Sequence, residues 1–501
     1  MLDDKITLSR QTGSSRLIYS LPVIFAMSVF HSRQRRSFLG IGVAGGLQLA
    51  LGSTAAQAKT GVAPVTAASD RQSRGARAKN VIVILEQGGV SQFDSWDPKP
   101  DAVSEHRSPH APIATNVPGI QISSLLKKTS QVVDKLAIVR SFYHKTNVAN
   151  GHPLGTQYAL SGSVPGGPLE MPDIGSIVAH QIGTRCDWLP PYVMVPGNHE
   201  QAAMTRHGFL AASTKVFKTG GRDLADPAWK VNDLGLIAGI DEGRFQDRLD
   251  LLSNLNIGVR PQGGDSVSTM SAMLDQASDM LGNPRTQRAF RLSDEPDGVR
   301  DAYGRGHRGQ CYLLGRRLIE AGVRFVTVDV REPLSKLAPG GANMNWDHHD
   351  YMYRDGCCGT ERIAAGGEGR YGIGTWWMMG STDQAFAALV ADLSERGMLD
   401  DTLVCFVTEF GRTPRLNKFQ GRDHWTNSYS MAFAGAGVRG GQVIGKTDRD
   451  GGYVLERGLT PEDYAATIYA KLGIHGERPI YTRENRPVFF SHGGRPIAEL
   501  M

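Results

Sequence analysis

Several apolar runs along the chain have the length and composition of strands buried on both faces of a sheet. The first, NVIVILEQGG, starts at Asn80 as a continuous branched-aliphatic run and closes with two glycines. Unbroken runs without polar alternation are typical of parallel strands covered by helices. The other predicted strands are residues 136–142, 192–197, 323–330 and 402–408.

Two of these strands follow amphipathic helical patterns. The segment GQCYLLGRRLIEAGVRFVTVDV gives a helix, a glycine turn and a strand, and TDQAFAALVADLSERGMLDDTLVCFVTEFG repeats the scheme. Helix–strand alternation with apolar strands predicts the α/β class, with a mostly parallel central sheet and helices on both faces. In such sheets, functional groups gather at the carboxyl ends of the strands.

The pattern between the strands is less regular. We expect a further helix near residues 122–133, and a loop-rich, helical insertion near residues 198–300. Residues 59–78 are small and polar without apolar periodicity, which predicts a flexible tether. The rest of the chain, residues 79–501, is expected to form the α/β domain.

The N-terminal region predicts export. Arg35 and Arg36 precede Ser37-Phe38-Leu39, then an apolar stretch rich in glycine and alanine, then the small-residue pattern Ala56-Gln57-Ala58. This layout indicates a twin-arginine signal within residues 1–58, with the twin-arginine translocase as a partner and a periplasmic or cell-surface destination. The stretch is too interrupted for a span of ~20 apolar residues, so no stable transmembrane span is expected in the mature chain. The start of translation is left open between Met1 and Met27.

Charge and cysteine content argue against a nucleic-acid-binding protein and against a disulfide-stabilised one. The formal net charge is +5, and the leader holds most of it through Lys5, Arg10, Arg16, Arg33, Arg35 and Arg36 against Asp3 and Asp4. The remainder is near neutrality, which argues against a nucleic-acid partner. The five cysteines are an odd number without paired spacing, so no disulfide framework is visible.

Polar residues follow the first predicted strand. Gly88 and Gly89 allow a tight turn, and Ser91 and Asp94 come after it. Ser91 could act as a nucleophile or lie in a loop that cradles an anion. Equally, Ser91 or Asp94 could simply cap a helix.

A second cluster, NMNWDHHDYMY, follows the strand at residues 323–330. Asp347 and His349 place a carboxylate and an imidazole two residues apart, and His348 offers an alternative ligand. Divalent metals of hard to borderline character take this mixture of ligands.

The third cluster, VTEFGRTPRLNKFQGRDHW, follows the strand at residues 402–408. It contains Glu409, Arg412, Asp423 and His424. A guanidinium donates in a planar fork to phosphate, sulfate or carboxylate, so Arg412 suits an anionic oxygen. Alternatively, Arg412 could pair with Glu409, or Arg422 with Asp423, in ion pairs that only stabilise the loop. His152, between a glycine and a proline, is a second-rank candidate.

These residues together resemble a known bacterial family. GGVSQFDSWDPKP, NGHPLGTQYALSG, WDHHDY, ERGMLDDTLVCFVTEFGRTP, GRDHWTNSYSMAFAGAGVRGGQVIGKTD and LTPEDYAATIYAKLGI look like the family called domain of unknown function 1501, from about Lys79 to the C-terminus. That family is similar to the alkaline phosphatase and sulfatase superfamily and is described as sulfatase-like. The resemblance implies an alkaline phosphatase-like fold with one or two divalent metals beside a Ser, Thr or formylglycine nucleophile.

The resemblance also implies roles by position. Asp347 and His349 match one metal-binding slot, Glu409 stands at a strand-end ligand position, and Asp423-His424 fits a late loop. Ser91 takes the nucleophile's place.

The chain also departs from the superfamily pattern. Glu86 stands near the usual first-strand Asp, Phe410 cannot bind a metal, and no cysteine begins a Cys-x-Pro-x-Arg motif, which disfavours a formylglycine sulfatase.

The leading hypothesis is an exported metal-dependent hydrolase of phosphate or sulfate esters. Its metal would be zinc, calcium, manganese or magnesium, held by Asp347, His349, Glu409, Asp423 and His424. Arg412 would neutralise the ester oxygens, and Ser91 or a water would attack. The alternative is a non-catalytic periplasmic or cell-surface binding protein that retains the scaffold.

Overall fold

The computed structural model describes residues 77–197, 203–220, 223–231, 234, 241–258, 276–281, 283–330, 345–355, 357–358 and 370–501. All of them belong to the second of two units into which the chain divides, Val65–Met501. The predicted export signal, residues 1–58, and most of the predicted tether lie outside the described residues. Among the described residues, no helix combines the length and apolar character needed to cross a membrane.

Eight strands form the central sheet, in the order β14-β4-β13-β10-β1-β7-β5-β6. Their bounds are β1 Asn80–Glu86, β4 Leu136–Phe142, β5 Tyr192–Val195, β6 Phe217–Lys218, β7 Phe325–Val330, β10 Thr402–Val407, β13 Tyr429–Ala434 and β14 Gln442–Ile444. Only β13 runs antiparallel to its two neighbours among these strands. The sheet is therefore mostly parallel, as the sequence predicts.

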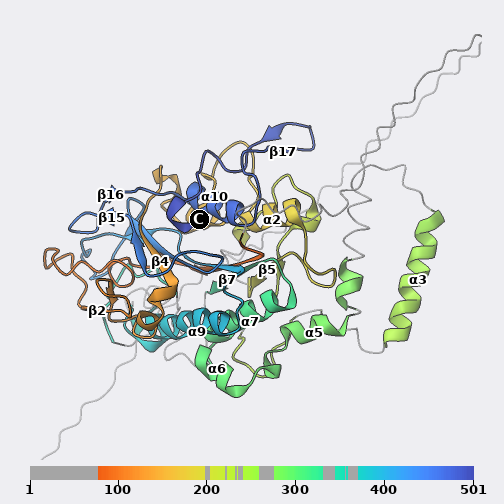
Figure 1. Ribbon diagram of the computed structural model, residues 1–501, viewed down its shortest axis with the longest axis horizontal. Helices are drawn as coiled ribbons and strands as arrows, with labels where there is room; N and C mark the ends of the chain where they lie inside the picture. The colour runs from red at the N-terminus through yellow and green to blue at the C-terminus, as the bar shows by residue number, and fades with distance from the viewer. Residues whose placement is uncertain are drawn as a thin grey trace, which may run out of the picture. The chain divides into compact units, whose positions relative to one another are not determined.

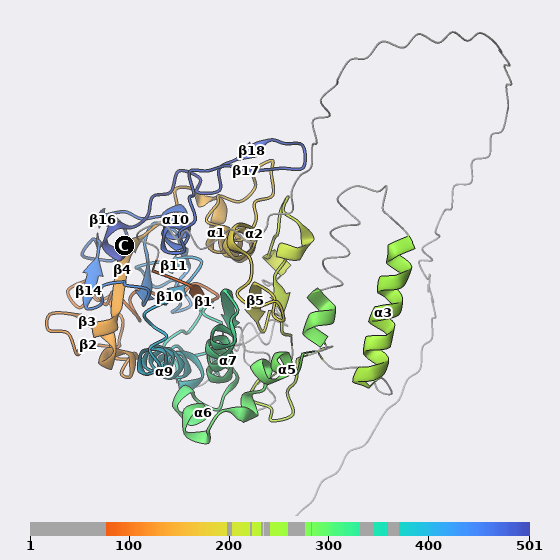
Figure 2. The same ribbon diagram turned by 45° about the vertical axis from the view of Figure 1, so that its right-hand side comes forward.

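Helices cover both faces of this sheet (Figure 1). On one side lie two helices, α7 (His307–Ala321) and α9 (Ser381–Glu395). On the other side lie three, α1 (His152–Ser161), α2 (Ile174–Ile182) and α10 (Pro461–Lys471), as Figure 2 also shows. Further α-helices in the described part of the chain include α3 Glu242–Gly258, α5 Pro284–Phe290 and α6 Asp297–Tyr303. The prediction of the α/β class with helices on both faces is confirmed.

Strand β1 shows why the apolar runs are continuous. All seven of its residues are buried, with Ile82 and Ile84 in one apolar cluster and Val81, Val83 and Leu85 in the other. Side chains alternate between the faces of a strand, so a strand with helices on both sides is apolar along its middle, with the polar Asn80 and Glu86 only at its two ends.

Five two-stranded sheets lie outside the central sheet among the described residues. They are β2 Pro112–Ala114 with β3 Gln121–Ser123, β8 Cys357–Cys358 with β9 Arg370–Tyr371, β11 Gly411–Arg412 with β12 His424–Trp425, β15 Lys446–Thr447 with β16 Val454–Glu456, and β17 Ile480–Tyr481 with β18 Pro487–Val488. Of these pairs, β11–β12 carries residues of the predicted site.

The predicted helix at residues 122–133 is wrong. The chain there forms the end of β3 and two short 3-10 turns, Thr129–Gln131 and Val133–Lys135. Polar groups compete with helical hydrogen bonds: the Asp383 carboxylate accepts from the backbone N–H groups of Lys128 and Thr129 at 2.8 and 2.7 Å, and Ser130 Oγ donates to Lys127 O. The predicted insertion near residues 198–300 is only partly described, and it contains α3 and α5.

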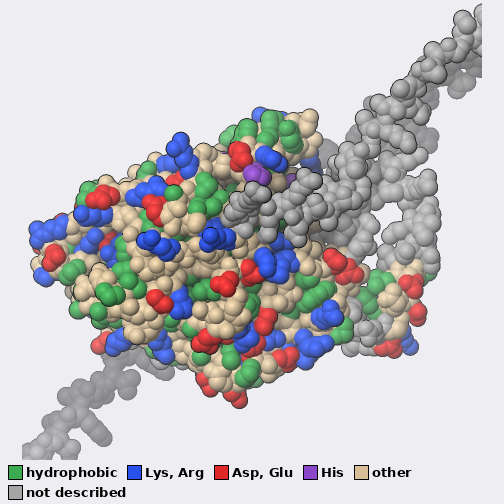
Figure 3. All heavy atoms as spheres, in the orientation of Figure 1, with side chains coloured by type: hydrophobic (Ala, Val, Ile, Leu, Met, Phe, Trp, Pro, Cys, Tyr) green, Lys and Arg blue, Asp and Glu red, His purple; other side chains and the backbone are tan. Residues whose placement is uncertain are grey.

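Surface charge agrees with the near-neutral composition of the folded part. On the face shown in Figure 3, basic and acidic side chains are interspersed rather than gathered by sign.

Candidate metal centre

The predicted clusters meet at the carboxyl ends of neighbouring strands. The turn after β1, the segment 345–350 that comes after β7, and Glu409, two residues after β10, lie at one edge of the sheet, because β1 pairs with both β7 and β10 in parallel. The β11–β12 hairpin follows β10, and its register sets Arg412 opposite His424. The N-terminus of α1 brings His152 to the same place.

Three imidazoles surround one carboxylate oxygen. The Nε2 atoms of His152, His349 and His424 lie 3.1, 2.8 and 3.1 Å from Asp347 Oδ1. The Nε2 atoms of His349 and His424 are 3.0 Å apart. Ligand atoms of His152, Asp347 and His424 all lie within 4.8 Å of one another. We call His152, Asp347, His349 and His424 the central cluster.

Every imidazole of the central cluster is oriented through its other nitrogen. Nδ1 of His152 contacts Glu409 Oε1, Nδ1 of His349 lies 2.8 Å from Asp423 Oδ1, and Nδ1 of His424 lies 3.0 Å from the Asn150 carbonyl oxygen. An acceptor at Nδ1 holds a proton on that nitrogen and turns Nε2 toward Asp347, which is how metal-binding histidines are usually oriented.

The central cluster fits a metal ion in a way that hydrogen bonding alone does not explain. His152 Nε2 is buried and has no hydrogen-bond partner, because its approach to Asp347 lies outside hydrogen-bond geometry. The Nε2 atoms of His349 and His424 face each other at 3.0 Å, so at most one proton fits between them, and a cation would satisfy the lone pairs that remain. The donor set of three imidazoles and one carboxylate is therefore a suitable metal-binding set.

Electrostatics favour a cation at this place. Burial alone raises the pKa of Asp347, but the three histidines and Arg412 together hold that pKa well below its usual range. Burial lowers the pKa of His152, and the carboxylates of Asp347 and Glu409 overcome this and raise it to about 9. The metal-free cluster thus retains a proton that a bound metal ion would displace.

Arg412 supports Asp347 instead of facing a ligand. Its guanidinium is fully buried, and it donates to Asp347 Oδ1 at 2.9 Å, to Gly89 O at 3.0 Å, to Arg422 O at 2.9 Å and to Gly88 O. The predicted contact of Arg412 with ester oxygens is not supported by this placement, because these acceptors already occupy the guanidinium.

Glu409 and Asp423 belong to the surroundings of the cluster. Glu409 is fully buried and accepts hydrogen bonds from Thr156 Oγ1 at 3.0 Å and from Gly88 N at 3.1 Å, in addition to its contact with His152. Asp423 also accepts from Asn417 Nδ2 at 3.0 Å. Sequence reasoning assigned both as direct ligands, whereas here each carboxylate orients an imidazole.

Ser91 and Asp94 form a separate network. Ser91 is 1% exposed and its hydroxyl donates to Asp94 Oδ2 at 2.5 Å, while Asp94 also accepts from Ser108 and from Tyr353. Among the contacts of the described residues, none joins Ser91 to the central cluster. Of the two roles left open by the sequence, this arrangement favours a structural one.

Glu86 and His348 also lie outside the central cluster. Glu86 accepts from Tyr312 OH at 2.6 Å and from Trp346 Nε1 at 2.7 Å, with Arg308 Nε at 3.4 Å. His348 Nε2 donates to Tyr371 O at 2.7 Å. Both residues are buried and tie the loop after β7 to its neighbours.

The Phe410 ring leaves no room for a side chain at two glycine positions. Its ring packs on His152 and His424, with centroids 5.3 and 4.4 Å apart. A Cβ on Gly89 or on Gly155 would lie 2.8 or 2.9 Å from this ring. Phe410 therefore packs against two histidines of the cluster that also contact each other, with ring centroids 4.4 Å apart.

Sequence reasoning ranked His152 too low and missed Asn150 and Thr156. The signal was the segment NGHPLGTQ, in which Pro153 starts a helix directly beside a histidine. A proline at the first helical turn fixes the helix start, and so it fixes the direction of the preceding side chain.

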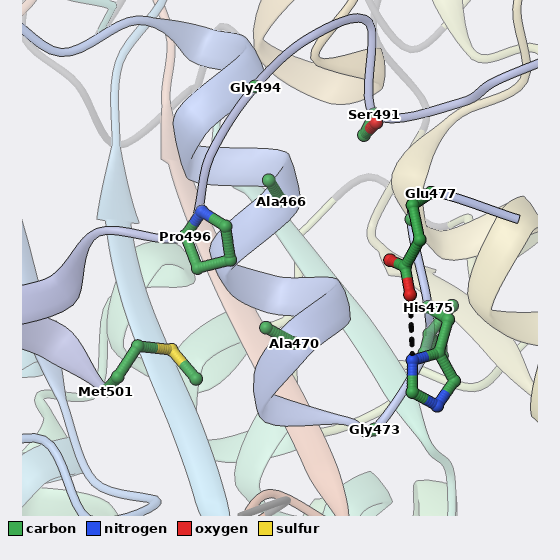
Figure 4. Close-up of a pocket in the computed structure, with 11 residues that line it drawn as sticks. Ala466, Ala470, Gly473, His475, Glu477, Ser491, Gly494, Pro496 and Met501 are labelled. Atoms are coloured by element: carbon green, nitrogen blue, oxygen red, sulfur yellow. Dashed lines mark hydrogen bonds and ion pairs between the residues drawn. The ribbon is translucent and has the colours of Figure 1, made fainter. Parts of the chain in front are cut away.

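A separate hollow lies away from the central cluster. A cavity of about 340 Å³ lies beside α10, lined by Ala466, Ala470, Gly473, Pro496 and Met501 among others, with His475 Nδ1 3.1 Å from Glu477 Oε1 (Figure 4). None of the site residues predicted from the sequence lines it.

Comparison with known proteins identifies the family. Residues 78–501 match the family model described as "Protein of unknown function (DUF1501)". The chain belongs to this family. No curated protein matches the chain.

Solved structures with a related arrangement include three enzymes of named activity. The phosphonate monoester hydrolase of Agrobacterium radiobacter is 12% identical, with 84% of this chain and 78% of that chain covered and a TM-score of 0.34. The lipoteichoic acid synthase LtaP from Listeria monocytogenes is 9% identical, with 83% and 75% covered and a TM-score of 0.34. The PsFucS1 sulfatase from Pseudoalteromonas sp. is 13% identical, with 81% and 70% covered and a TM-score of 0.32. Likeness at this level says nothing about what this DUF1501 protein binds or hydrolyses.

Proposed function

We propose that this DUF1501 protein is a metal-dependent hydrolase of phosphate or sulfate esters. One observation carries the proposal: three imidazole Nε2 atoms converge on Asp347 Oδ1 while each Nδ1 is held by its own acceptor. This is the geometry of a site that binds a cation through nitrogen and oxygen.

The ligand types narrow the choice of metal. Calcium, magnesium and manganese prefer oxygen ligands, whereas imidazole suits zinc, copper, iron and nickel. Of the four metals expected from the sequence, zinc fits the three imidazoles of the central cluster better than calcium, magnesium or manganese.

The chain's own residues have distinct roles in this proposal. A bound divalent cation supplies Lewis-acid polarisation of the ester and activation of water. His152, His349, His424 and Asp347 hold it. Glu409 and Asp423 keep the protons of two imidazoles on Nδ1, and Arg412 balances the charge of Asp347. Because Ser91 is engaged with Asp94, water is the nucleophile we propose.

Elemental analysis tests the proposal. The full chain is purified without chelator or affinity metal, beside Asp347→Ala and the control Asp94→Asn, which alters a buried carboxylate outside the cluster. We expect a stoichiometric divalent metal in the wild type and in Asp94→Asn, and none in Asp347→Ala. Absence of metal after incubation with zinc, manganese or calcium would overturn the proposal.

Turnover of phosphate and sulfate monoesters then separates the enzyme from the binding protein. Metal with hydrolysis that is lost in Asp347→Ala supports the enzyme. Metal with anion binding but no hydrolysis supports the non-catalytic alternative. Export by the twin-arginine pathway stays a prediction, which fractionation of expressing cells checks.

A further inference from the structure

The hairpin formed by β17 and β18 exposes an apolar face. Ile480 pairs with Val488 and Tyr481 pairs with Pro487, so the side chains of Tyr481 and Pro487 lie on one face. Phe489 follows Pro487 by two residues and shares that face by the same alternation. Tyr481 is 57% exposed and Phe489 is 56% exposed. We call Tyr481, Pro487 and Phe489 the hairpin face.

The opposite face of the hairpin is fixed to the core. Ile480 is 4% exposed and belongs to an apolar cluster against which Val488 packs. The Phe490 ring meets the ring of Tyr469 on α10, with centroids 5.0 Å apart and 88° between the ring planes. The backbone that carries the exposed rings is therefore held in place before anything binds, which lowers the entropic cost of binding.

Three arginines border the hairpin face. Arg478 precedes β17, and Arg483 and Arg486 lie in the turn between the two strands. Their side chains are exposed, and no ion pair or side-chain hydrogen bond involves them within the described part of the chain. Residues 478–489 contain a single acidic side chain, that of Glu484. The hairpin therefore presents unpaired positive charge around its apolar face.

This combination is complementary to an anionic phospholipid surface. A guanidinium donates in a planar fork to phosphate oxygens. Aromatic side chains favour the boundary between lipid headgroups and acyl chains, where a ring is half in hydrocarbon and half in water. A bilayer that contains anionic lipid offers both kinds of partner within a few ångströms of depth. Figure 3 shows apolar side chains gathered on the surface where Figure 1 draws β17.

The size of the patch favours a lipid surface over a protein. A stable protein–protein interface uses roughly 20–30 residues from each side. The hairpin face and its border consist of three apolar side chains and three arginines, which is too few for such an interface but enough for shallow insertion into a bilayer. The near-neutral charge of the folded part argues against a nucleic acid.

We propose that the β17–β18 hairpin docks this protein on an anionic phospholipid surface. Tyr481 and Phe489 enter the boundary between headgroups and acyl chains, and Arg478, Arg483 and Arg486 bind lipid phosphates. No residue of this surface belongs to the central cluster, so the inference goes beyond the proposed function and does not depend on it.

Vesicle binding tests the inference. The full chain is mixed with phosphatidylglycerol vesicles or phosphatidylcholine vesicles, and bound protein is measured by co-sedimentation over a series of salt concentrations. We expect binding to phosphatidylglycerol that weakens as salt rises and that exceeds binding to phosphatidylcholine. The double variant Tyr481→Ala, Phe489→Ala should bind roughly 10-fold more weakly, and Arg483→Gln roughly 5-fold more weakly. Every variant keeps residues 1–58, so the contribution of that segment is common to all.

Tyr453→Ala and Arg415→Gln are the matched controls. Tyr453 is 56% exposed, the side chain of Arg415 is 76% exposed, and both lie on other segments, so neither change should alter vesicle binding. Hydrogen exchange locates the contact: phosphatidylglycerol vesicles should slow exchange at residues 478–489 and leave residues 446–456 unchanged.

Three outcomes overturn the inference. They are absence of binding to phosphatidylglycerol, equal binding by the hairpin variants and the controls, and unchanged exchange at residues 478–489. A loss of oligomers in the lipid-free Tyr481→Ala, Phe489→Ala variant, measured by light scattering, would also overturn it, because the hairpin face would then join copies of this chain. Metal content and ester hydrolysis are measured separately, so the hydrolase proposal stands or fails independently.

Discussion

At the scale of single residues, the Glu409 carboxylate is placed to orient a histidine of the central cluster. Glu409 is fully buried, and the three donors around it come from His152, Thr156 and Gly88. A buried charge needs such partners, and here one of them is the imidazole that the carboxylate orients. Glu409 therefore raises the basicity of His152 and fixes its direction at once.

Glu409→Gln should weaken metal binding. The glutamine amide has an NH₂ group at the place of one carboxylate oxygen, so it cannot accept every hydrogen bond that Glu409 accepts. The substitution also removes the negative charge beside His152. We expect metal affinity to fall roughly 10- to 100-fold, as for other partners of metal-binding histidines. Competition with a chromophoric chelator measures this affinity.

Asp94→Asn is the control for this change, because it makes the same substitution in a buried carboxylate that pairs with Ser91 and Tyr353. Equal metal affinity in wild type, Glu409→Gln and Asp94→Asn would show that Glu409 does not act through His152.

At the scale of elements, a glycine lets the turn after β1 approach the segment that carries Asp347. Gly88 has φ +101°, and a Cβ on it would lie 2.5 Å from Trp346 N and 2.6 Å from Asp347 N. The turn after β1 can therefore press directly on the backbone that carries the carboxylate ligand. The glycine pair noted in the sequence is needed for this close approach as well as for the turn.

Gly88→Ala should displace Asp347 and reduce metal binding. The backbone atoms that the new Cβ meets cannot rotate away, so the segment 346–347 must shift. Gly119→Ala separates this effect from backbone strain, because Gly119 has φ +84° and nothing within 4 Å of its added Cβ.

We expect Gly119→Ala to lose about 1–2 kcal/mol of unfolding free energy through its positive φ, and Gly88→Ala to lose more, because its Cβ also meets backbone atoms. Only Gly88→Ala should also lose metal affinity. Urea denaturation and chelator competition measure the two quantities, and an equal metal affinity in the two variants contradicts the proposed packing.

How much the sequence could predict also differs among elements. Strands β1, β4, β7 and β10 were predictable because burial on both faces leaves an apolar run that no other element explains. The absence of a helix at residues 122–133 could not be predicted, because the Asp383 carboxylate that accepts hydrogen bonds from their backbone lies on a helix distant in sequence.

The same limit applies within the site. Sequence placed Asp347, His349 and His424 at one edge of the sheet, but whether Glu409 binds a metal or a histidine depends on side-chain direction. Spacing along the chain does not encode that direction, and His152 enters the cluster from a helix on a separate segment.

At the scale of the whole molecule, the sheet separates two apolar clusters, and one buried histidine lies close to the metal centre. His144 is 5% exposed, and its ring packs on those of Tyr158 and Tyr429 with centroids 4.8 and 5.4 Å apart. Burial lowers the pKa of His144 to about 4 from an ordinary value of 6.5. The fold therefore holds this imidazole neutral over a range in which the unfolded chain would protonate it.

This difference makes stability fall in acid. Between pH 6.5 and 4 the unfolded state binds more protons at His144 than the folded state does, so the free energy of unfolding decreases as pH falls through that window. His144→Phe keeps an aromatic ring between the two tyrosines and removes the titration. By urea denaturation, we expect the loss of unfolding free energy between pH 7 and pH 4.5 to be smaller in His144→Phe than in the wild type by about 2–3 kcal/mol. His475→Phe, at a site whose side chain is 46% exposed, should leave the loss unchanged. If His144→Phe loses as much stability as the wild type over this range, acid sensitivity arises elsewhere, and the neutral His144 plays no part in it.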